Sequence, residues 1–178
     1  MGEITNFTPE KLIMAVLLSN REILEELTSV LTDNFGPVDY ISELLDFNYT
    51  DYYNFEMGNK IERFFLSFKN LIDPENLPDI KILTNKLENN FLVNKQRKVN
   101  LDPGMLSVKR FILATSKDNG HRIPMQKGIY GEVTLLFISK NFQALPWTYI
   151  DYQSEEYSII LKEIRALYKI NLKELKQN

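Results

Sequence analysis

The chain has 178 residues, a net charge of −3, 44% hydrophobic residues and no cysteine. Disulfides, thiolate catalysis and cysteine metal sites are therefore excluded. Acidic and basic residues are interspersed, which argues against specific nucleic-acid binding, because phosphate contacts need a concentrated basic surface. No apolar run approaches the roughly 18 residues of a membrane span, and residues 1–12 lack the features of a signal peptide. We expect one cytoplasmic domain over residues 1–178, with no membrane association.

The chain opens with a predicted strand and a predicted helix. Lys11–Ser19 is a nearly continuous apolar run, typical of a strand buried on both faces. Ser19 and Glu22 then have the spacing of a capping box. The helix that follows is predicted to end at Gly36, and its apolar face comprises Ile23, Leu27, Val30 and Leu31.

Two more strands and a second helix are predicted next. Val38–Phe47 is expected to be a strand, followed by an aromatic-rich connection over Asn48–Lys60. Ile61–Leu71 alternates apolar and polar residues, which predicts a half-buried strand. Asp73–Pro78 is a turn that leads into a helix, whose apolar residues recur at helical spacing over Ile80–Phe91.

The last third predicts a hairpin, a strand and a closing helix. Asp102-Pro103-Gly104 is expected to be the hairpin turn, with Gly104 at positive φ. Ile129–Ser139 alternates: Val133, Leu135 and Phe137 are predicted on one face, and Tyr130, Glu132 and Thr134 on the other. Ser154 is predicted to cap a helix whose apolar face comprises Tyr157, Ile160, Leu161, Ile164 and Tyr168.

This element order predicts an α+β fold. A mostly antiparallel sheet would have a ferredoxin-like βαββαβ core, extended by extra C-terminal strands and a closing helix. Helices are expected on one face of the sheet. The other face would then be available for a ligand, a partner or further cover.

Polar chemistry is concentrated in Ser116–Glu132, "SKDNGHRIPMQKGIYGE", which contains the only histidine. His121 can exchange a proton near neutral pH, with Asp118 or Glu132 as its acid–base partner. Lys117 and Arg122 are candidates for holding an anion. The spacing of these residues fits no established metal site, and no metal is predicted. The alternative interpretation is an ordinary surface loop.

Two aromatic segments are candidates for stacking a ligand ring. Tyr52 lies in "TDYY" beside Asp51, and Trp147 lies in "LPWTYIDY". The alternative is that these rings cover the core. A P-loop GTPase is not expected, because both G-x-x-x-x-G-K-[ST] and G-x-G-x-x-G are absent. "TNKLE" over 84–88 is only superficially similar to a guanine-reading motif.

Six segments resemble one known family: "TDYYNFEMG", "KILTNKLE", "VNLDPGML", "LATSKDNGHRI", "GIYGEVTL" and "LPWTYIDY", in this order over residues 50–152. They are similar to an uncharacterised bacterial family, catalogued as a domain of unknown function. Some of its members are labelled GTP-binding protein or GTP-binding regulator. The resemblance implies a shared fold and a bacterial, cytoplasmic protein, but no particular activity and no known cofactor.

Three functions remain open at this stage. The first is the binding of a small anionic or nucleotide-like ligand at one rim of the sheet, through Lys117, Arg122, His121, Glu132, Tyr130, Asp51, Tyr52 and Trp147. The second is an enzyme that uses His121 with Asp118 or Glu132 as acid and base. The third is an interaction module that forms a homodimer through an open sheet face. A concave pocket would favour the first two.

Overall fold

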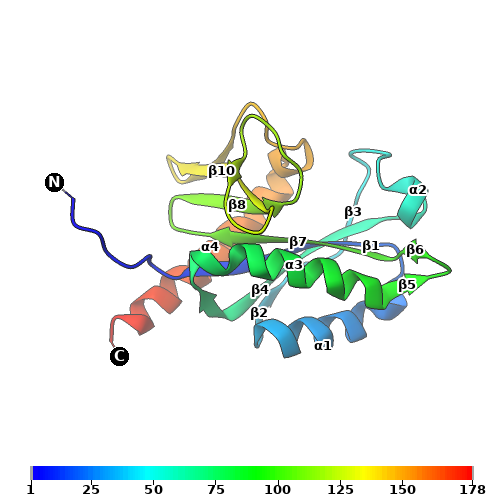
Figure 1. Ribbon diagram of the computed structural model, residues 1–178, viewed down its shortest axis with the longest axis horizontal. Helices are drawn as coiled ribbons and strands as arrows, with labels where there is room; N and C mark the ends of the chain where they lie inside the picture. Colours follow the sequence, from blue (N-terminus) through cyan, green and yellow to red (C-terminus); the bar gives the residue numbers. More distant parts are fainter. Residues whose placement is uncertain (1, 178) are drawn as a thin grey trace.

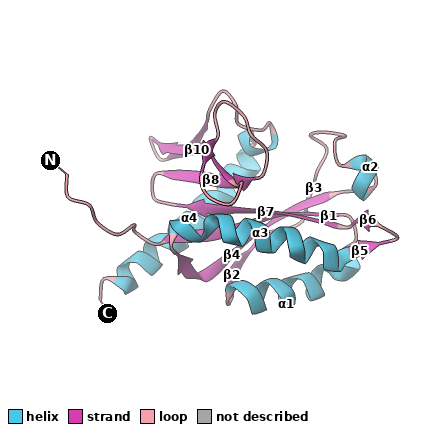
Figure 2. Ribbon diagram, viewed as in Figure 1, coloured by secondary structure: helices cyan, strands magenta, loops and turns pink. Residues whose placement is uncertain are grey.

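A mostly antiparallel sheet organises the protein, and helices pack against both of its faces (Figures 1 and 2). The computed structural model describes residues 2–177. Within them the main sheet has nine strands, in the order β11-β10-β8-β7-β1-β4-β2, with β3 paired to β4 and β9 to β10. The expected α+β class is confirmed.

The elements follow one another along the chain without a long gap. The strands are β1 Glu10–Leu18, β2 Val38–Ile41, β3 Leu45–Asp46, β4 Glu62–Ile72, β5 Leu92–Val93, β6 Gln96–Arg97, β7 Val99–Leu106, β8 Arg110–Thr115, β9 Ile123–Pro124, β10 Tyr130–Ile138 and β11 Asn141–Ala144. The helices are η1 Arg21–Ile23, α1 Leu24–Phe35, α2 Asn54–Met57, η2 Pro74–Asn76, α3 Leu77–Leu87, η3 Glu88–Phe91, η4 Asp151–Gln153 and α4 Glu155–Leu175.

The first strand is buried along its whole length, as its apolar run predicts. The capping box predicted at Ser19 is wrong. Asn20 is the N-cap instead, and its side chain accepts a hydrogen bond from the Glu22 backbone N–H at 3.0 Å. A turn of 3-10 helix precedes α1, so the cap falls one residue later than expected. Gly36 ends α1 with φ of +91°.

The second predicted strand is shorter than expected. Val38–Phe47 contains β2 and β3, separated by a break over 42–44, and both pair with β4 at the edge of the sheet. The half-buried character predicted for Ile61–Leu71 is also wrong, because Glu62–Phe68 is buried on both sides. A helix covers each face here, so Glu62, Arg63 and Ser67 lie inside the protein.

The two faces of the sheet have separate cores. Leu12, Met14 and Val16 of β1 pack with α1 and α3 on one face. Ile13 and Ala15 pack with α4 on the other. Figure 1 shows α1 and α3 on one side of the sheet and α4 behind it. The expectation of helices on one face only is therefore wrong. Of the three alternatives for the other face, a ligand, a partner or further cover, α4 provides further cover.

The predicted hairpin at Asp102-Pro103-Gly104 is also wrong. These residues lie within β7 and pair with β1, and Gly104 does not have positive φ. The pairing of β7 with β8 runs from Leu106 back to Gly104 and ends beside Pro103, which has no N–H to donate to a ladder. The two strands separate beyond this point, and the turn between them lies at 107–109.

A bulge changes the expected alternation in β10. The pairing of β10 with β8 shifts register between Val133 and Leu135. Leu135 consequently packs on the α4 side, whereas Val133 packs on the opposite side. The predicted common face of Val133, Leu135 and Phe137 is therefore wrong, because one extra residue reverses the alternation. Glu132 pairs with Leu113 and faces the α4 side.

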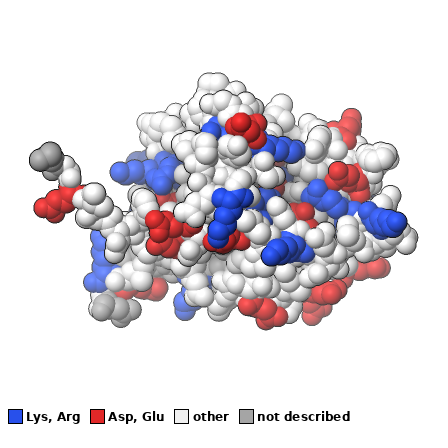
Figure 3. All heavy atoms as spheres, in the orientation of Figure 1, with Lys and Arg blue, Asp and Glu red and all other residues white. Residues whose placement is uncertain are grey.

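No helix in the described part of the chain has the length and apolar character needed to cross a membrane. Figure 3 shows acidic and basic side chains interspersed on the face viewed there.

Candidate functional site

A cleft of about 510 Å³ opens where β7 and β8 separate. Its walls come from segments that are far apart in the sequence. They are Phe47, Tyr49, Thr50, Tyr52 and Tyr53 between β3 and α2, Lys81 and Asn85 on one side of α3 with Glu88 just after it, Ser116 and Lys117 just after β8, and residues 149–152. The ends of several elements thus enclose one concave space.

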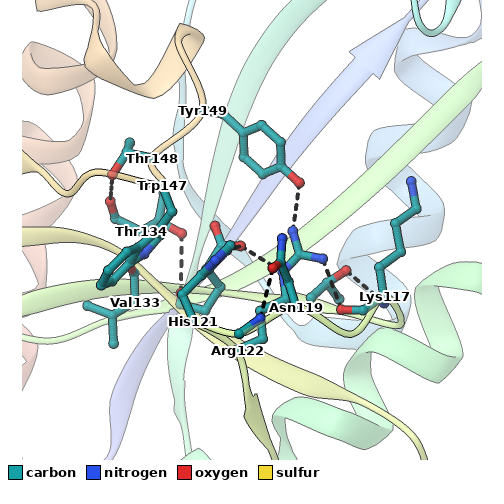
Figure 4. A network of polar contacts seen from close by, with 12 residues as sticks. Lys117, Asn119, His121, Arg122, Val133, Thr134, Trp147, Thr148 and Tyr149 are labelled. Atoms are coloured by element: carbon teal, nitrogen blue, oxygen red, sulfur yellow. Dashed lines mark hydrogen bonds and ion pairs between the residues drawn. The ribbon is translucent and has the colours of Figure 1, made fainter.

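At the rim of the cleft, Arg122 binds three partners. Its Nε donates to Glu132 Oε2 at 2.8 Å, its Nη1 to the Lys117 carbonyl at 2.9 Å, and its Nη2 to the Tyr149 hydroxyl at 2.8 Å (Figure 4). We call Lys117, Arg122 and Glu132 the rim network. Only 2% of the Glu132 side chain is exposed, and its Oε1 has no hydrogen-bond partner among the described residues.

His121 lies behind the rim network. Its Nε2 is 2.9 Å from Glu132 Oε2, and its ring stacks on Trp147 at a centroid distance of 5.2 Å and an interplanar angle of 11°. Trp147 Nε1 donates to the Val133 carbonyl at 2.9 Å (Figure 4). Within residues 2–177, neither His121 nor Trp147 lines the cleft. His121 thus contacts Glu132 from outside the cleft, and Trp147 packs against His121.

Lys117 bridges the two sides of the cleft mouth. Its Nζ donates to the Tyr52 hydroxyl at 3.0 Å and lies 4.7 Å from the centroid of the Tyr52 ring. Lys117 makes no ion pair with any residue in the described range. Two of its three ammonium hydrogens therefore remain available to a ligand.

Three residues named from the sequence lie apart from the cleft. Asp51 accepts a hydrogen bond from Asn54 Nδ2 at 2.8 Å, at the start of α2. Asp118 is exposed and makes no side-chain contact with His121 among the described residues. Tyr130 pairs with Thr115 and Pro124 in the sheet. None of the three is a wall residue in the described structure.

The floor of the cleft holds four charged residues that the sequence analysis did not select. Arg63 Nη1 is 3.7 Å from Asp102 Oδ2, and Arg63 Nη2 is 3.5 Å from Asp151 Oδ2. Lys81 Nζ is 3.6 Å from Asp102 Oδ1 and donates to the Leu101 carbonyl at 2.8 Å. We call Arg63, Lys81, Asp102 and Asp151 the floor cluster.

Arg63 is the most deeply placed member of the floor cluster, with 3% of its side chain exposed. Its guanidinium lies 5.2 Å from the Phe47 ring centroid and 6.0 Å from that of Tyr152. Burial would lower the pKa of Arg63, but the phenolic and acidic groups around it raise that pKa above its usual value. Arg63 therefore stays charged. Its Nε and Nη1 have no hydrogen-bond acceptor among residues 2–177.

The two carboxylates of the floor cluster differ in surroundings. Burial raises the pKa of Asp151, and the charge of Arg63 only partly opposes this. Asp102 is more accessible, with 26% of its side chain exposed, and its Oδ2 accepts from Asn100 Nδ2 at 2.7 Å. Asp102 is thus the floor carboxylate that a ligand reaches most easily.

The end of α3 is tied to β7 beside the floor. Glu88 Oε1 accepts from the Leu101 backbone N–H at 2.7 Å, and Glu88 Oε2 is 3.3 Å from Arg97 Nη2. Burial raises the pKa of Glu88, while this backbone bond opposes the rise. Thr84 is buried and donates to the Lys81 carbonyl within α3, and Leu87 packs in the core, so these two residues of "TNKLE" have a structural role.

Arg122 has a structural role in addition to its place at the rim. Burial would lower its pKa, and its bonds to Glu132 and Tyr149 raise that pKa above its usual value. Only 6% of its side chain is exposed. Because Arg122 neutralises a buried carboxylate, we expect its loss to affect folding as well as any binding at the rim.

Sequence reasoning missed the floor cluster for a physical reason. Arg63 interrupts the apolar strand "IERFFLSF", and a charged residue at such a position can indicate a buried ion pair. The polar side of this strand was instead expected to face solvent. Asp102 was expected in a turn. Their contacts join β4 to β7 and η4, and such long-range pairs leave no local pattern in a sequence. Within the described residues no group of three or more His, Asp or Glu side chains could hold a metal ion.

Comparison with known proteins gives one match. A family model described as a domain of unknown function (DUF4416) matches residues 8–168. The chain belongs to the DUF4416 family. No curated protein and no solved structure matches. The DUF4416 match covers every wall of the cleft but assigns it no activity.

Proposed function

We propose that the cleft binds a small anionic or nucleotide-like molecule, whose anionic group is held at the rim by Lys117 and Arg122. The charge of the wall carries this proposal. Five cationic and four anionic side chains line the cleft, although the whole chain has a net charge of −3. They are Arg63, Lys81, Arg97, Lys117 and Arg122, against Glu88, Asp102, Glu132 and Asp151. An excess of one sign in a concave site concentrates ions of the other sign.

The size and lining of the cleft support a small ligand. Its volume of about 510 Å³ falls within the roughly 300–1,000 Å³ of typical ligand pockets. Tyr52, Tyr53 and Tyr149 contribute aromatic surface beside the rim. Such rings pack well against a planar or apolar part of a ligand.

The other two hypotheses have less support. His121 is engaged by Glu132 and Trp147 and does not line the cleft in the described structure, which weakens its role as a catalytic acid or base. A dimer through an open sheet face lacks that face, because α4 covers it. We do not propose that the protein is a P-loop GTPase. A magnesium-dependent GTPase rate in pure protein would contradict this.

Isothermal titration calorimetry at low ionic strength tests the proposal, with inorganic phosphate and n-propyl phosphate as probes. We expect Lys117→Ala to weaken binding by about tenfold, because a hydrogen bond to a charged group is worth roughly 1.5–3 kcal/mol. Lys86→Ala is the matched control, since Lys86 is an exposed lysine of α3 outside the cleft. Absence of binding by both probes, or an equal loss in the control, would contradict an anion site at the rim.

A further inference from the structure

The floor of the cleft differs from the rim in its charge balance. The floor cluster contains two cations and two carboxylates, joined by ion pairs of 3.5–3.7 Å. A phosphate beside it would add a buried charge without a partner, which is costly. The rim network has two cations and one carboxylate. The floor therefore suits an uncharged polar group, and the rim suits the anion.

The floor also places donors beside acceptors. Arg63 Nη1 and Asp102 Oδ2 are 3.7 Å apart, beyond hydrogen-bond distance, and Arg63 Nε and Nη1 have no acceptor in the described range. Asn85 lies one helical turn after Lys81 on α3 and faces the same cleft, where its amide offers both a donor and an acceptor. A hydroxyl group matches this arrangement, because it donates and accepts at the same atom.

Apolar rings enclose these polar groups. Phe47 and Tyr152 flank the Arg63 guanidinium, and Tyr53 lines the cleft nearby. Burial raises the pKa of Tyr53 well above its usual value, which keeps its hydroxyl neutral. A ligand part that reaches the floor thus meets neutral aromatic surface together with closely spaced hydrogen-bonding groups.

We infer that the ligand is a phosphorylated polyhydroxyl compound, a sugar phosphate or polyol phosphate. Its phosphate lies at the rim network and its hydroxyls lie at the floor cluster. This inference rests on the proposed function, and it adds the chemical class of the ligand. A simple alkyl phosphate fills the rim alone, whereas a hydroxylated phosphate also uses Asp102 and Asn85.

The test compares n-propyl phosphate with sn-glycerol 3-phosphate, ribose 5-phosphate and glucose 6-phosphate by calorimetry on the full chain. We expect at least one hydroxylated probe to bind about tenfold more tightly than n-propyl phosphate. Asp102→Asn should remove that preference, measured as the ratio of the hydroxylated-probe affinity to the n-propyl phosphate affinity in the same variant, because losing a carboxylate changes the attraction of the cleft for every phosphate. Asn85→Ala provides a second variant, because Asn85 is exposed and its side chain makes no hydrogen bond among the described residues.

The outcomes distinguish failure of the ligand class from failure of the anion site. Binding of n-propyl phosphate without any preference for the hydroxylated probes overturns the ligand class and leaves the anion site in place. A preference that survives both Asp102→Asn and Asn85→Ala overturns the placement of the hydroxyls at the floor. Failure of all four probes overturns the anion site and the ligand class together.

Discussion

Gly104 provides a quantitative test of how closely β7 and β8 pack at the edge of the cleft. A Cβ added to Gly104 would lie 2.6 Å from the Ile112 carbonyl oxygen and 2.7 Å from Phe111 Cε2. Both contacts are far shorter than ordinary van der Waals contact. The carbonyl belongs to a paired strand, so relief requires β8 to move away from β7. Close approach of two strands, rather than a turn, is thus the reason for glycine here.

The cost of Gly104→Ala follows from this geometry. Overpacking in a core costs about 1–3 kcal/mol, and a backbone neighbour cannot rotate aside, so we expect roughly 2–3 kcal/mol in the free energy of unfolding. Gly104→Val should cost more. Gly131→Ala meets Met125 Sδ at 3.2 Å, and this flexible side chain can adjust, so its expected cost is below about 1 kcal/mol.

Gly120→Ala is the matched control for the glycine series. A Cβ added to Gly120 would have no atom within 4 Å, and the residue does not have positive φ. Alanine there should leave stability unchanged or raise it by about 0.4–1 kcal/mol, because it restricts the unfolded chain. Urea titration measures the series, with an unchanged m value as evidence of two-state unfolding. Equal stability of Gly104→Ala and Gly120→Ala would refute the close approach of β7 and β8.

Two further predictions concern buried carboxylates. Arg122→Met should cost about 3 kcal/mol, because it leaves Glu132 buried without its guanidinium partner. The double variant Arg122→Met/Glu132→Gln should recover part of this loss, and a double variant less stable than Arg122→Met would count against the ion pair. Burial raises the pKa of Glu10 above 4.5, and Arg110 only partly opposes this. The folded state therefore holds the Glu10 proton more tightly, so the stability of wild type relative to Glu10→Gln should fall as the pH rises through and above 4.5. A pH-independent difference in urea titrations would contradict this.

Local pattern alone determined several elements of the protein. The apolar run at Lys11–Ser19 predicted a strand buried on both faces, and β1 is one. Ser154 was predicted to cap the closing helix, and its side chain accepts from the Tyr157 backbone N–H at 3.3 Å. The five residues predicted for the apolar face of that helix are its buried residues. Caps and amphipathic faces depend on neighbours a few residues away, so a sequence records them directly.

The candidate site was predictable only in part. His121, Arg122 and Glu132 lie within twelve residues, and a loop that folds back on its own strand brings them together. Lys117 contacts Tyr52, although the two residues are 65 positions apart in the chain. The sequence predicted only that the connecting segments containing them lie at the same rim of the sheet.

Only the tertiary structure determined which residues form the floor of the cleft. Asp102-Pro103-Gly104 has the local preferences of a turn, yet pairing with β1 over the whole of β7 keeps it extended, because many ladder bonds and buried side chains outweigh one turn preference. That extended course places Asp102 beside Arg63, 39 residues away in the chain. The sequence predicted that Arg63 faces solvent, but α4 covers this side of the sheet and Arg63 is buried. A buried charge needs a partner of opposite charge, and the fold supplies Asp102 and Asp151.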